Sequence, residues 1–279
     1  MSARLTAAGL QCISCDFLDR FSVDRLPQVP NIVYMADRKF GTDGGEAMTW
    51  ASNTVIPANV VHHFSDSRIV AFSTGNIYPL VAVTSEGALK MTPPAPIGEY
   101  AQSCLGRERV FMWGSLENET PVLTFRLNYA VDLRYGVLFD IGTKVFNDQV
   151  VDLDTGYFNC IWQGDANTQA LLSLAHCASP PTILNVTGPE TVSVRLVAET
   201  FVGIFGKSAE LVGTENSTAL LSNSKAATDL FGYPTVSLQR LIEWTAHWIK
   251  IGGGDAQTPA TIVAVMGAPN GFWSITLDL

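Results

Sequence analysis

The segment "NIVYMA", Asn31 to Ala36, is almost entirely apolar. A parallel strand that is covered by helices on both faces has this composition. Similar short apolar runs surround it in the chain: "LQCISCDF" before it, then "RIVAFS" and "PVLTFRLN" after it. Segments of helical length separate these runs, and this alternation is typical of βαβ units. The sequence therefore predicts an α/β protein with a parallel sheet.

The spacing of apolar residues and the end signals place the predicted helices. The stretch from Gly45 to Phe64 carries alanines and valines near helical spacing. A second long helix follows the proline-rich loop "MTPPAPIGE", and after about Tyr135 the alternation is less regular. In that later part we expect one helix that is closed by Gly206 and another that is capped by Ser237.

The bulk composition excludes several classes of protein. The 279-residue chain is 47% hydrophobic and carries a formal net charge of −9, so it is a core-rich acidic protein. Its charge and the lack of a Lys/Arg cluster disfavour nucleic acid as a partner. No run of 18 apolar residues is available to span a membrane. The stretch "MSARLTAAGLQC" lacks the pattern of an export signal, so we expect a cytoplasmic protein.

The five cysteines predict free thiols and no metal centre. Cys12 and Cys15 form a C-x-x-C pair, but no second pair completes a tetrahedral site. Residues three apart on a strand point to opposite faces, which also opposes a shared ligand. We therefore expect small buried side chains at these positions.

Several motifs together resemble the extended short-chain dehydrogenase/reductase family, the NAD(P)-dependent nucleotide-sugar epimerases and dehydratases. The resemblance covers about Leu5 to Trp248 and rests on the order and spacing of the motifs, none of which is specific alone. They are "CDF", "VYMADRKFG", "ASNTVIPANVV", "AFSTGNIYP", "FRLNYA" and the later segments "LNVTGPETVSVRLVAETFVGIFGK" and "NSKAATDLFGYPTVSLQRLIEW".

The resemblance implies a Rossmann-like parallel sheet flanked by helices, shortened at its N-terminal side, with a smaller C-terminal α/β substrate-binding region. Residues 1–134 would form the NAD(P)-binding core. Residues 135–250 would be mainly the substrate-binding region, from which Thr182–Val186 could return to the main sheet. Residues 251–279 stay unassigned. The family often pairs through its two long helices, which here implies a homodimer.

The resemblance also implies roles in transient hydride transfer between NAD or NADP and a nucleotide sugar or related polyol. Tyr100 would act as the base, while Ser73 and Thr74 would orient the carbonyl. Read without the resemblance, these residues are a helix-start aromatic and a polar strand end. Cofactor contacts are implied for Asp16, Phe17, Ala36, Lys39, Asn53, Cys104, Asn128 and Tyr129, and substrate contacts for Asn76 and Arg134.

The chain departs from the family pattern at its front. No strand with G-x-x-G-x-x-G precedes "LQCISCDF", although the family receives the pyrophosphate on such a turn. About one βαβ half-unit, roughly 50–60 residues, is missing by this alignment, as in a fragment or a shortened fold. We expect "LQCISCDF" and "NIVYMA" to lose a sheet neighbour and expose an edge.

A second departure is Cys104, which stands where the family's Y-x-x-x-K motif places lysine. A thiol supplies no positive charge to lower the pKa of Tyr100. Lys39 is a candidate replacement cation, and Arg107 is a weaker one. Two functions stay open: an NAD(P)-dependent epimerase or dehydratase, and a non-catalytic binding or sensor protein that has lost turnover.

Overall fold

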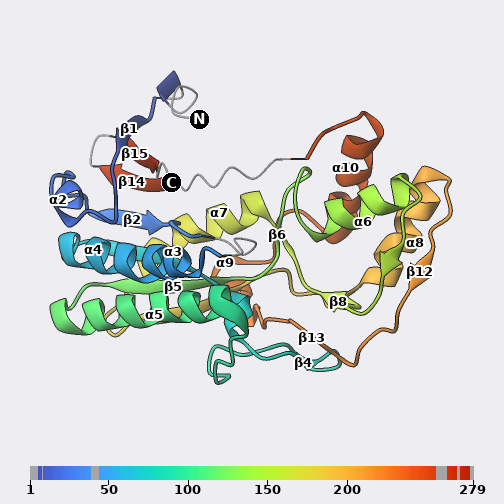
Figure 1. The fold of residues 1–279 in the computed structure, drawn as a ribbon, viewed down its shortest axis with the longest axis horizontal. Coiled ribbons are helices and arrows are strands. Elements are labelled where there is room, and N and C mark those ends of the chain that lie inside the picture. The colour runs from blue at the N-terminus through green and yellow to red at the C-terminus, as the bar shows by residue number, and fades with distance from the viewer. Residues whose placement is uncertain (1–5, 8, 39–43, 256–262, 269–270, 277–279) are drawn as a thin grey trace.

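The computed structural model describes residues 6–7, 9–38, 44–255, 263–268 and 271–276. A seven-stranded sheet forms the centre of the first lobe (Figure 1). Its strands, in order across the sheet, are β1 (Gln11–Ser14), β15 (Gly271–Thr276), β14 (Val263–Ala268), β2 (Asn31–Tyr34), β3 (Arg68–Thr74), β5 (Val122–Leu127) and β10 (Thr182–Val186). All neighbouring pairs are parallel except those made by β14, which confirms the α/β fold with a mainly parallel sheet.

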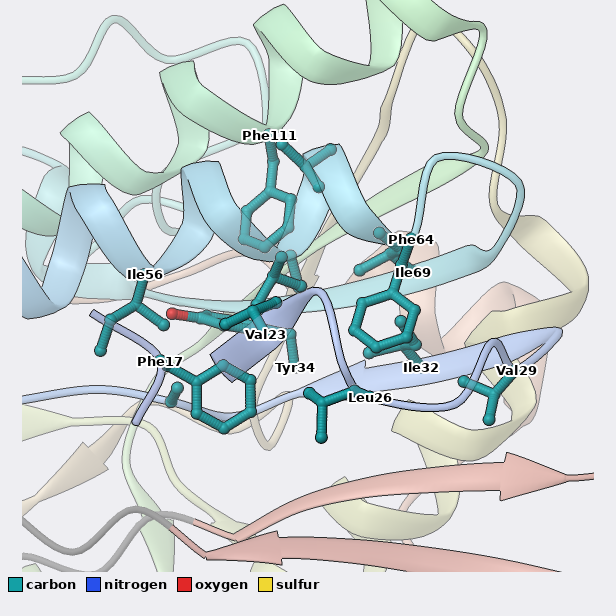
Figure 2. Packing of buried hydrophobic residues seen from close by; sticks show 14 of the residues in the cluster. Phe17, Val23, Leu26, Val29, Ile32, Tyr34, Ile56, Phe64, Ile69 and Phe111 are labelled. Atoms are coloured by element: carbon teal, nitrogen blue, oxygen red, sulfur yellow. The ribbon is translucent and has the colours of Figure 1, made fainter. Parts of the chain in front are cut away.

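Helices α2 (Arg20–Val23), α4 (Ile56–His63) and α5 (Gly98–Asn118) cover one face of this sheet. Figure 2 shows the buried rings that fill the space between them. Tyr34 from β2 packs edge-on against Phe111 from α5, with 5.0 Å between the ring centroids. This cluster joins the two long helical segments to the strands that carry the candidate site.

The opposite face is covered by α7 (Gln163–Leu172) and α9 (Lys225–Phe231). Val33 and Val70 point into this second cluster, whereas their neighbours Ile32 and Ile69 point into the first. Successive side chains of a strand alternate between faces, so β2 and β3 need apolar residues at consecutive positions. The run "NIVYMA" is apolar for this reason.

The helical stretch predicted from Gly45 to Phe64 is one rod with an internal irregularity. It consists of α3 (Glu46–Trp50), a π-helical turn (Ala51–Val55) and α4. Pro57 lies in the first turn of α4, and it has no N–H to continue the α-helical ladder. A π-turn before a proline is the local solution that keeps the rod continuous.

A second lobe, at the right of Figure 1, is built on α6 (Val137–Phe146), α8 (Val194–Phe205) and α10 (Leu238–Lys250). The predicted helix ends are confirmed: Ser237 accepts the Arg240 N–H, and Gly206 ends α8 with φ of 65°. Short pairs accompany these helices: β4 (Val81–Ala82) with β13 (Thr218–Ala219), β6 (Ala130–Val131) with β9 (Ile161–Trp162), β7 (Val151–Asp152) with β12 (Leu211–Val212), and β8 (Tyr157–Phe158) with β11 (Val192–Ser193).

Two segments of the chain return to the main sheet from the second half. Thr182–Val186 forms β10, which runs parallel to β5 along its whole length. In the region 251–279, left unassigned from the sequence, β14 and β15 form an antiparallel hairpin. Within the described part of the chain, no helix has both the length and the apolarity that crossing a lipid bilayer requires.

The hairpin lies between the two strands that were expected to expose an edge. β15 runs parallel to β1, and β14 runs antiparallel to β2. Both strands therefore have a neighbour on that side, and the expected exposed edge is wrong. The physical need is general, because unpaired N–H and C=O groups of a strand must find partners.

We expect deletion of residues 256–279 to destabilise the protein strongly. The deletion removes both strands of the hairpin, so the edge strand β1 loses its neighbour in the sheet and β2 is left unpaired on one side. At about 0.5–1.5 kcal/mol net per hydrogen bond, the free energy of unfolding should fall by roughly 3 kcal/mol or more. Urea denaturation followed by circular dichroism measures this loss. Deletion of 277–279 alone is the control, since it keeps β14 and β15 whole.

Candidate active site

The candidate site lies at the edge of the sheet where β2, β3 and β5 end. These strands are parallel and adjacent, so their carboxyl ends bring Asp37, Thr74 and Asn128 to one edge. Ligands of open α/β sheets bind outside the carboxyl ends of the strands. The first turn of α5 reaches the same edge, because the Tyr100 hydroxyl donates to Asp37 Oδ2 over 3.1 Å.

The Arg107 guanidinium is the central charged group beneath this edge. Arg107 is only 2% exposed, and it forms an ion pair with Asp37. It also donates to the Phe72 carbonyl oxygen at 2.9 Å and to Asn53 Oδ1 at 2.8 Å. A buried guanidinium needs such partners because an unpaired buried charge is very costly. Arg107 thereby ties α5 to the ends of β2 and β3.

Asn53 connects the same elements from the π-turn. Its side-chain amide donates to the Ser103 hydroxyl at 2.9 Å, and its oxygen accepts the Arg38 backbone N–H. The side chain has no exposed surface. Asn53 thus holds the segment after β2 against α5, and its contacts here are with the protein itself.

Cys104 lies inside this cluster and is fully buried. Burial raises the pKa of its thiol to about 12, while the nearby Arg107 charge works in the opposite direction. A thiol in this state is neutral at physiological pH and offers no charge to a cofactor. In the position of the lysine, the chain therefore has a small apolar filler, and the nearby positive charge comes from Arg107, three residues later.

Tyr100 is consequently in a different electrostatic setting from a tyrosine beside a lysine. Burial and the Asp37 carboxylate raise its pKa well above the usual value, and Arg107 offsets only part of this. The phenol is therefore protonated at neutral pH and donates its hydrogen bond to Asp37. A tyrosinate base is not present under these conditions.

Ser73 belongs to a second buried network. Its hydroxyl donates to Glu108 Oε1 at 2.5 Å, and Arg126 makes two hydrogen bonds to the same carboxylate at 2.9 and 2.8 Å. Arg126 also donates to the Tyr78 hydroxyl, which in turn donates to Asn185 Oδ1. With its proton directed to Glu108, the Ser73 oxygen has only acceptor capacity left for a substrate.

The remaining residues at this edge come from the ends of β3 and β5. Thr74 caps the short helix Gly75–Ile77 by accepting the Asn76 N–H at 3.2 Å. A Cβ on Gly75 would lie 2.7 Å from Asn128 Oδ1, so glycine is required for the close approach of these two segments. Asn128 is buried and donates to Asn159 Oδ1 at 2.8 Å.

Other proposed cofactor residues lie in varied surroundings. Asp16 accepts the Leu18 backbone N–H at 2.9 Å, whereas the Phe17 ring is 2% exposed and packs in the first core cluster (Figure 2). Only the backbone of Phe17 remains for a cofactor. Ala36 is also buried, at the end of β2. Lys39 lies outside the described residues.

A cavity of about 170 Å³ opens between Tyr129 and the second lobe. Tyr129 is 37% exposed and has a left-handed backbone with φ of 44°. Burial raises the pKa of Asp140 in the cavity wall, and Lys144 works against that shift. Arg134 lies nearby in sequence, is exposed, and pairs with Asp132 at 2.9 Å. The lining comprises Tyr129, Val137, Asp140, Ile141, Lys144, Val151, Asp152, Thr155, Phe158 and Val194.

The residues at the site edge suit the nicotinamide half of a dinucleotide better than its pyrophosphate half. The nicotinamide half needs polar groups at the ends of neighbouring parallel strands, and Thr74 and Asn128 fit that need. The pyrophosphate half needs a glycine turn that opens a helix at the same edge. Gly267 of β14 pairs with Asn31, the first residue of β2, so this glycine lies at the opposite edge. No such turn occurs at the site edge among residues 9–38, 44–255, 263–268 and 271–276.

Two site carboxylates were missed in the sequence. Asp37 lies in the loop after β2, where no periodicity of apolar residues marks a position as part of a site. Glu108 and Arg107 both carry charges on the buried face of α5, four and three residues after Cys104. The sequence does contain one sign of this network: charged residues occur at helix positions whose spacing predicts burial, and buried charges need partners.

Cys15 is buried as expected, whereas Cys12 is only partly buried. All five are free thiols, and the pKa of Cys15 is raised by burial to about 11. In the described part of the chain, no group of three or more His, Cys, Asp or Glu side chains could hold a metal ion.

Comparison with known proteins gives a likeness at the level of structure. No protein-family model matches the sequence, and no curated protein matches it. Among solved structures, the NAD complex of UDP-glucuronic acid 4-epimerase from Bacillus cereus is 18% identical, with a TM-score of 0.70 over 85% of this chain and 80% of that one. The NAD complex of UDP-glucose 4-epimerase from Thermus thermophilus is 18% identical, with a TM-score of 0.69 over 89% of this chain and 94% of that one.

A short-chain dehydrogenase/reductase superfamily protein from Agrobacterium tumefaciens with bound NAD is 13% identical, with a TM-score of 0.73 over 85% of this chain and 84% of that one. The class of protein is therefore a Rossmann-like α/β protein. Its particular form is the fold of the extended short-chain dehydrogenase/reductases, and the likeness that the motifs indicated is confirmed for the fold.

We expect the substitution Arg126→Met to cost about 3–5 kcal/mol in the free energy of unfolding, because it leaves the Glu108 carboxylate buried without its guanidinium. Arg134→Met is the control, since it breaks an exposed ion pair worth below about 1 kcal/mol. Urea denaturation of both variants and the wild type gives the comparison. A loss below about 1 kcal/mol for Arg126→Met would contradict the buried network.

Proposed function

We propose that the protein is an NAD(P)-dependent epimerase or dehydratase that acts on a nucleotide sugar or related polyol. The observation that carries the proposal is the position of Thr74 and Asn128 at the carboxyl ends of the adjacent parallel strands β3 and β5, with Tyr100 in the first turn of α5 bonded to Asp37 after β2. The fold that contains them is shared with solved NAD complexes of UDP-sugar epimerases. NAD or NADP, when bound, would supply a reversible hydride acceptor.

In this proposal the residues of the edge handle the hydroxyl proton and the carbonyl oxygen. Tyr100 would take the proton of the substrate hydroxyl after releasing its own phenolic proton, and Thr74 would donate a hydrogen bond to the carbonyl oxygen that forms. Ser73 accepts from the substrate hydroxyl, because its own proton is directed to Glu108. Asp16, Ala36, Asn128 and the backbone of Phe17 would contact the cofactor, with Lys39 as a further candidate.

The second lobe would hold the nucleotide part of the substrate. The cavity beside Tyr129 combines aromatic and apolar walls with Lys144, a cation of the kind that contacts phosphate. Asn76 follows the end of β3, and Arg134 lies between Tyr129 and Val137 of the cavity wall in the chain, so both stay candidates for substrate contact.

The proposal is tested by titrating the purified chain with NAD, NADH, NADP and NADPH, using calorimetry and fluorescence. We expect either NAD and NADH or NADP and NADPH to bind. We also expect the protein to convert UDP-glucose or UDP-glucuronic acid to a second UDP-sugar, which chromatography detects. Tyr100→Phe should lower turnover by about 100-fold or more, which is the usual effect of losing a proton-transfer group. Cofactor affinity should stay nearly unchanged.

Tyr233→Phe is the matched control, because Tyr233 is 62% exposed and its hydroxyl contacts only a surface carboxylate in the described structure. It should turn over at the wild-type rate. No cofactor binding at millimolar concentration would end the oxidoreductase proposal and leave the non-catalytic binding protein as the remaining interpretation.

We also propose a homodimer through the outer faces of the two long helical segments. Large apolar side chains are exposed on both: Met48 and Val55 on the first, Trp113 and Leu116 on α5, with Trp113 54% and Leu116 57% exposed. The two segments pack closely on each other, since a Cβ on Gly114 would meet Val61 at 2.4 Å. A second copy of the chain would cover the apolar side chains.

Light scattering after gel filtration checks the dimer. We expect the wild type to be dimeric at micromolar concentration and Trp113→Glu with Leu116→Glu to be monomeric, because buried carboxylates oppose association. Leu196→Glu is the control, as Leu196 is 61% exposed on α8 in the other lobe. A monomeric wild type, or a double variant that stays dimeric, would refute this interface.

A further inference from the structure

The outer edge of β10, the last strand of the main sheet, carries unpaired backbone groups. The Val186 carbonyl oxygen accepts the Asn128 N–H at 2.9 Å, so the backbone groups of Val186 face β5. Peptide groups of successive strand residues point alternately to the two sides, so those of Ile183 and Asn185 face away from β5. Within the described residues, no strand pairs with this edge and no group bonds the outward N–H and C=O groups of these two residues.

A cavity of about 290 Å³ lies along this free edge. Ile183 and Asn185 line it from the sheet, while α9 forms one wall and residues 89–91 form the other. The walls come from opposite faces of the sheet, because Leu184 packs with Ala227 of α9, and the side chain of Asn185 points to the other face. The cavity is therefore a groove whose floor is the edge of β10.

The floor of the groove is poorly hydrated. Asn185 is only 3% exposed, although its outward backbone groups have no partner in the described structure. Buried N–H and C=O groups are costly without hydrogen bonds. An occupant that carries its own backbone N–H and C=O groups satisfies them, as a neighbouring strand does.

The wall formed by residues 89–91 is fixed in place and yet exposes apolar side chains. The buried Asn185 amide donates to the Ala88 carbonyl oxygen at 2.9 Å, directly before this wall. Leu89 and Met91 are nevertheless 52% and 79% exposed. Apolar side chains held beside a groove are typical of an interaction site.

The charge of the groove indicates the sign of its occupant. Lys90 and Lys225 lie on the two walls, with Asp229 beside the second of them. Lys225 is paired with Asp229 at 2.7 Å, whereas Lys90 has no ion-pair partner among the described residues. Two lysines against one aspartate leave the groove positive in a chain whose formal net charge is −9. An acidic partner complements this charge.

We propose that the groove binds an extended acidic peptide segment of a partner protein, which adds to the main sheet as an eighth strand beside β10. The peptide backbone pairs with Ile183 and Asn185. Its apolar side chains pack on Leu89 and Met91, and a carboxylate lies near Lys90. This is recognition by strand addition, in which backbone hydrogen bonds give affinity and side-chain contacts give specificity. It is independent of the proposed hydride transfer.

A second copy of this chain fits the groove less well than an isolated strand. In a two-fold interface the same patch faces itself, so Lys90 and Lys225 of one copy would meet those of the other. The β10 edge of the second copy would also lie between its own two walls. A single extended segment has neither obstacle.

The first test uses a fluorescein-labelled peptide of eight residues that alternates valine and aspartate. Fluorescence anisotropy with the full-length protein should show saturable binding, and its absence up to about 1 mM peptide overturns the proposal. The same peptide with N-methylated central residues should bind at least about tenfold more weakly, because it has lost its backbone donors. Equal binding of the two peptides overturns strand addition.

The second test places the peptide on the groove. Ile183→Pro removes an outward N–H that the sheet does not use, a change that edge strands tolerate, and it should weaken binding at least about tenfold. Lys90→Glu should weaken binding about threefold or more and reduce its salt dependence. Arg25→Glu is the matched control, since it makes the same change of charge beside α2 and should bind the peptide like the wild type.

The remaining outcomes are also decisive. Wild-type affinity in both Ile183→Pro and Lys90→Glu places the peptide elsewhere and overturns the proposal. Should Ile183→Pro fail to fold by circular dichroism, Ala226→Phe narrows the groove from the exposed surface of α9 and gives the same readout. Light scattering should show the same oligomeric state for the wild type and these variants. Loss of self-association in either groove variant would show a second copy on the edge and overturn the peptide assignment.

Discussion

The structure of the site depends on the need of one buried guanidinium for partners. Arg107 is almost inaccessible to water, and it satisfies its charge with Asp37 from the end of β2, Asn53 from the π-turn and the Phe72 carbonyl from β3. An uncompensated charge at this depth would cost several kcal/mol, so the three elements cannot separate without a large penalty. The direction of the Tyr100 hydrogen bond follows, because Asp37 is held where the phenol reaches it.

A second buried ion pair, between Arg126 and Glu108, lies beneath the same strand ends and binds Ser73. α5 contributes Arg107 to one network and Glu108 to the other, and consecutive residues of a helix point in different directions. The two networks therefore fasten one helix to β2 and β3 on one side and to β5 on the other. This arrangement positions Ser73 and Tyr100 through different carboxylates, since Ser73 donates to Glu108 and Tyr100 donates to Asp37.

Continuity of the sheet is the second constraint on the molecule. Rossmann-type sheets place a strand with a glycine turn between the strands that correspond to β1 and β2. Here the C-terminal hairpin fills that interval, and β14 runs antiparallel to β2. The backbone N–H and C=O groups in the middle of the sheet are thereby paired. Any segment that forms a strand there meets this need, because buried backbone groups must be hydrogen-bonded. Because β14 runs antiparallel to β2, its Gly267 lies at the edge of the sheet opposite the site. The hairpin therefore completes the sheet without bringing this glycine to the strand ends of the site.

The amino-acid sequence by itself determined the parallel strands, the helices between them and the family of folds, because a strand buried on both faces must be apolar along its whole length. "NIVYMA" and the caps Ser237 and Gly206 carry that local information. The sequence also led to the end of β3, where Ser73 and Thr74 lie, and to the first turn of α5, where Tyr100 lies. Only the tertiary structure decided that Asp37 and Glu108 are their partners, that Phe17 and Cys104 are buried, and that the last strands enter the middle of the sheet. These depend on contacts between residues far apart in the chain, and no local periodicity encodes them.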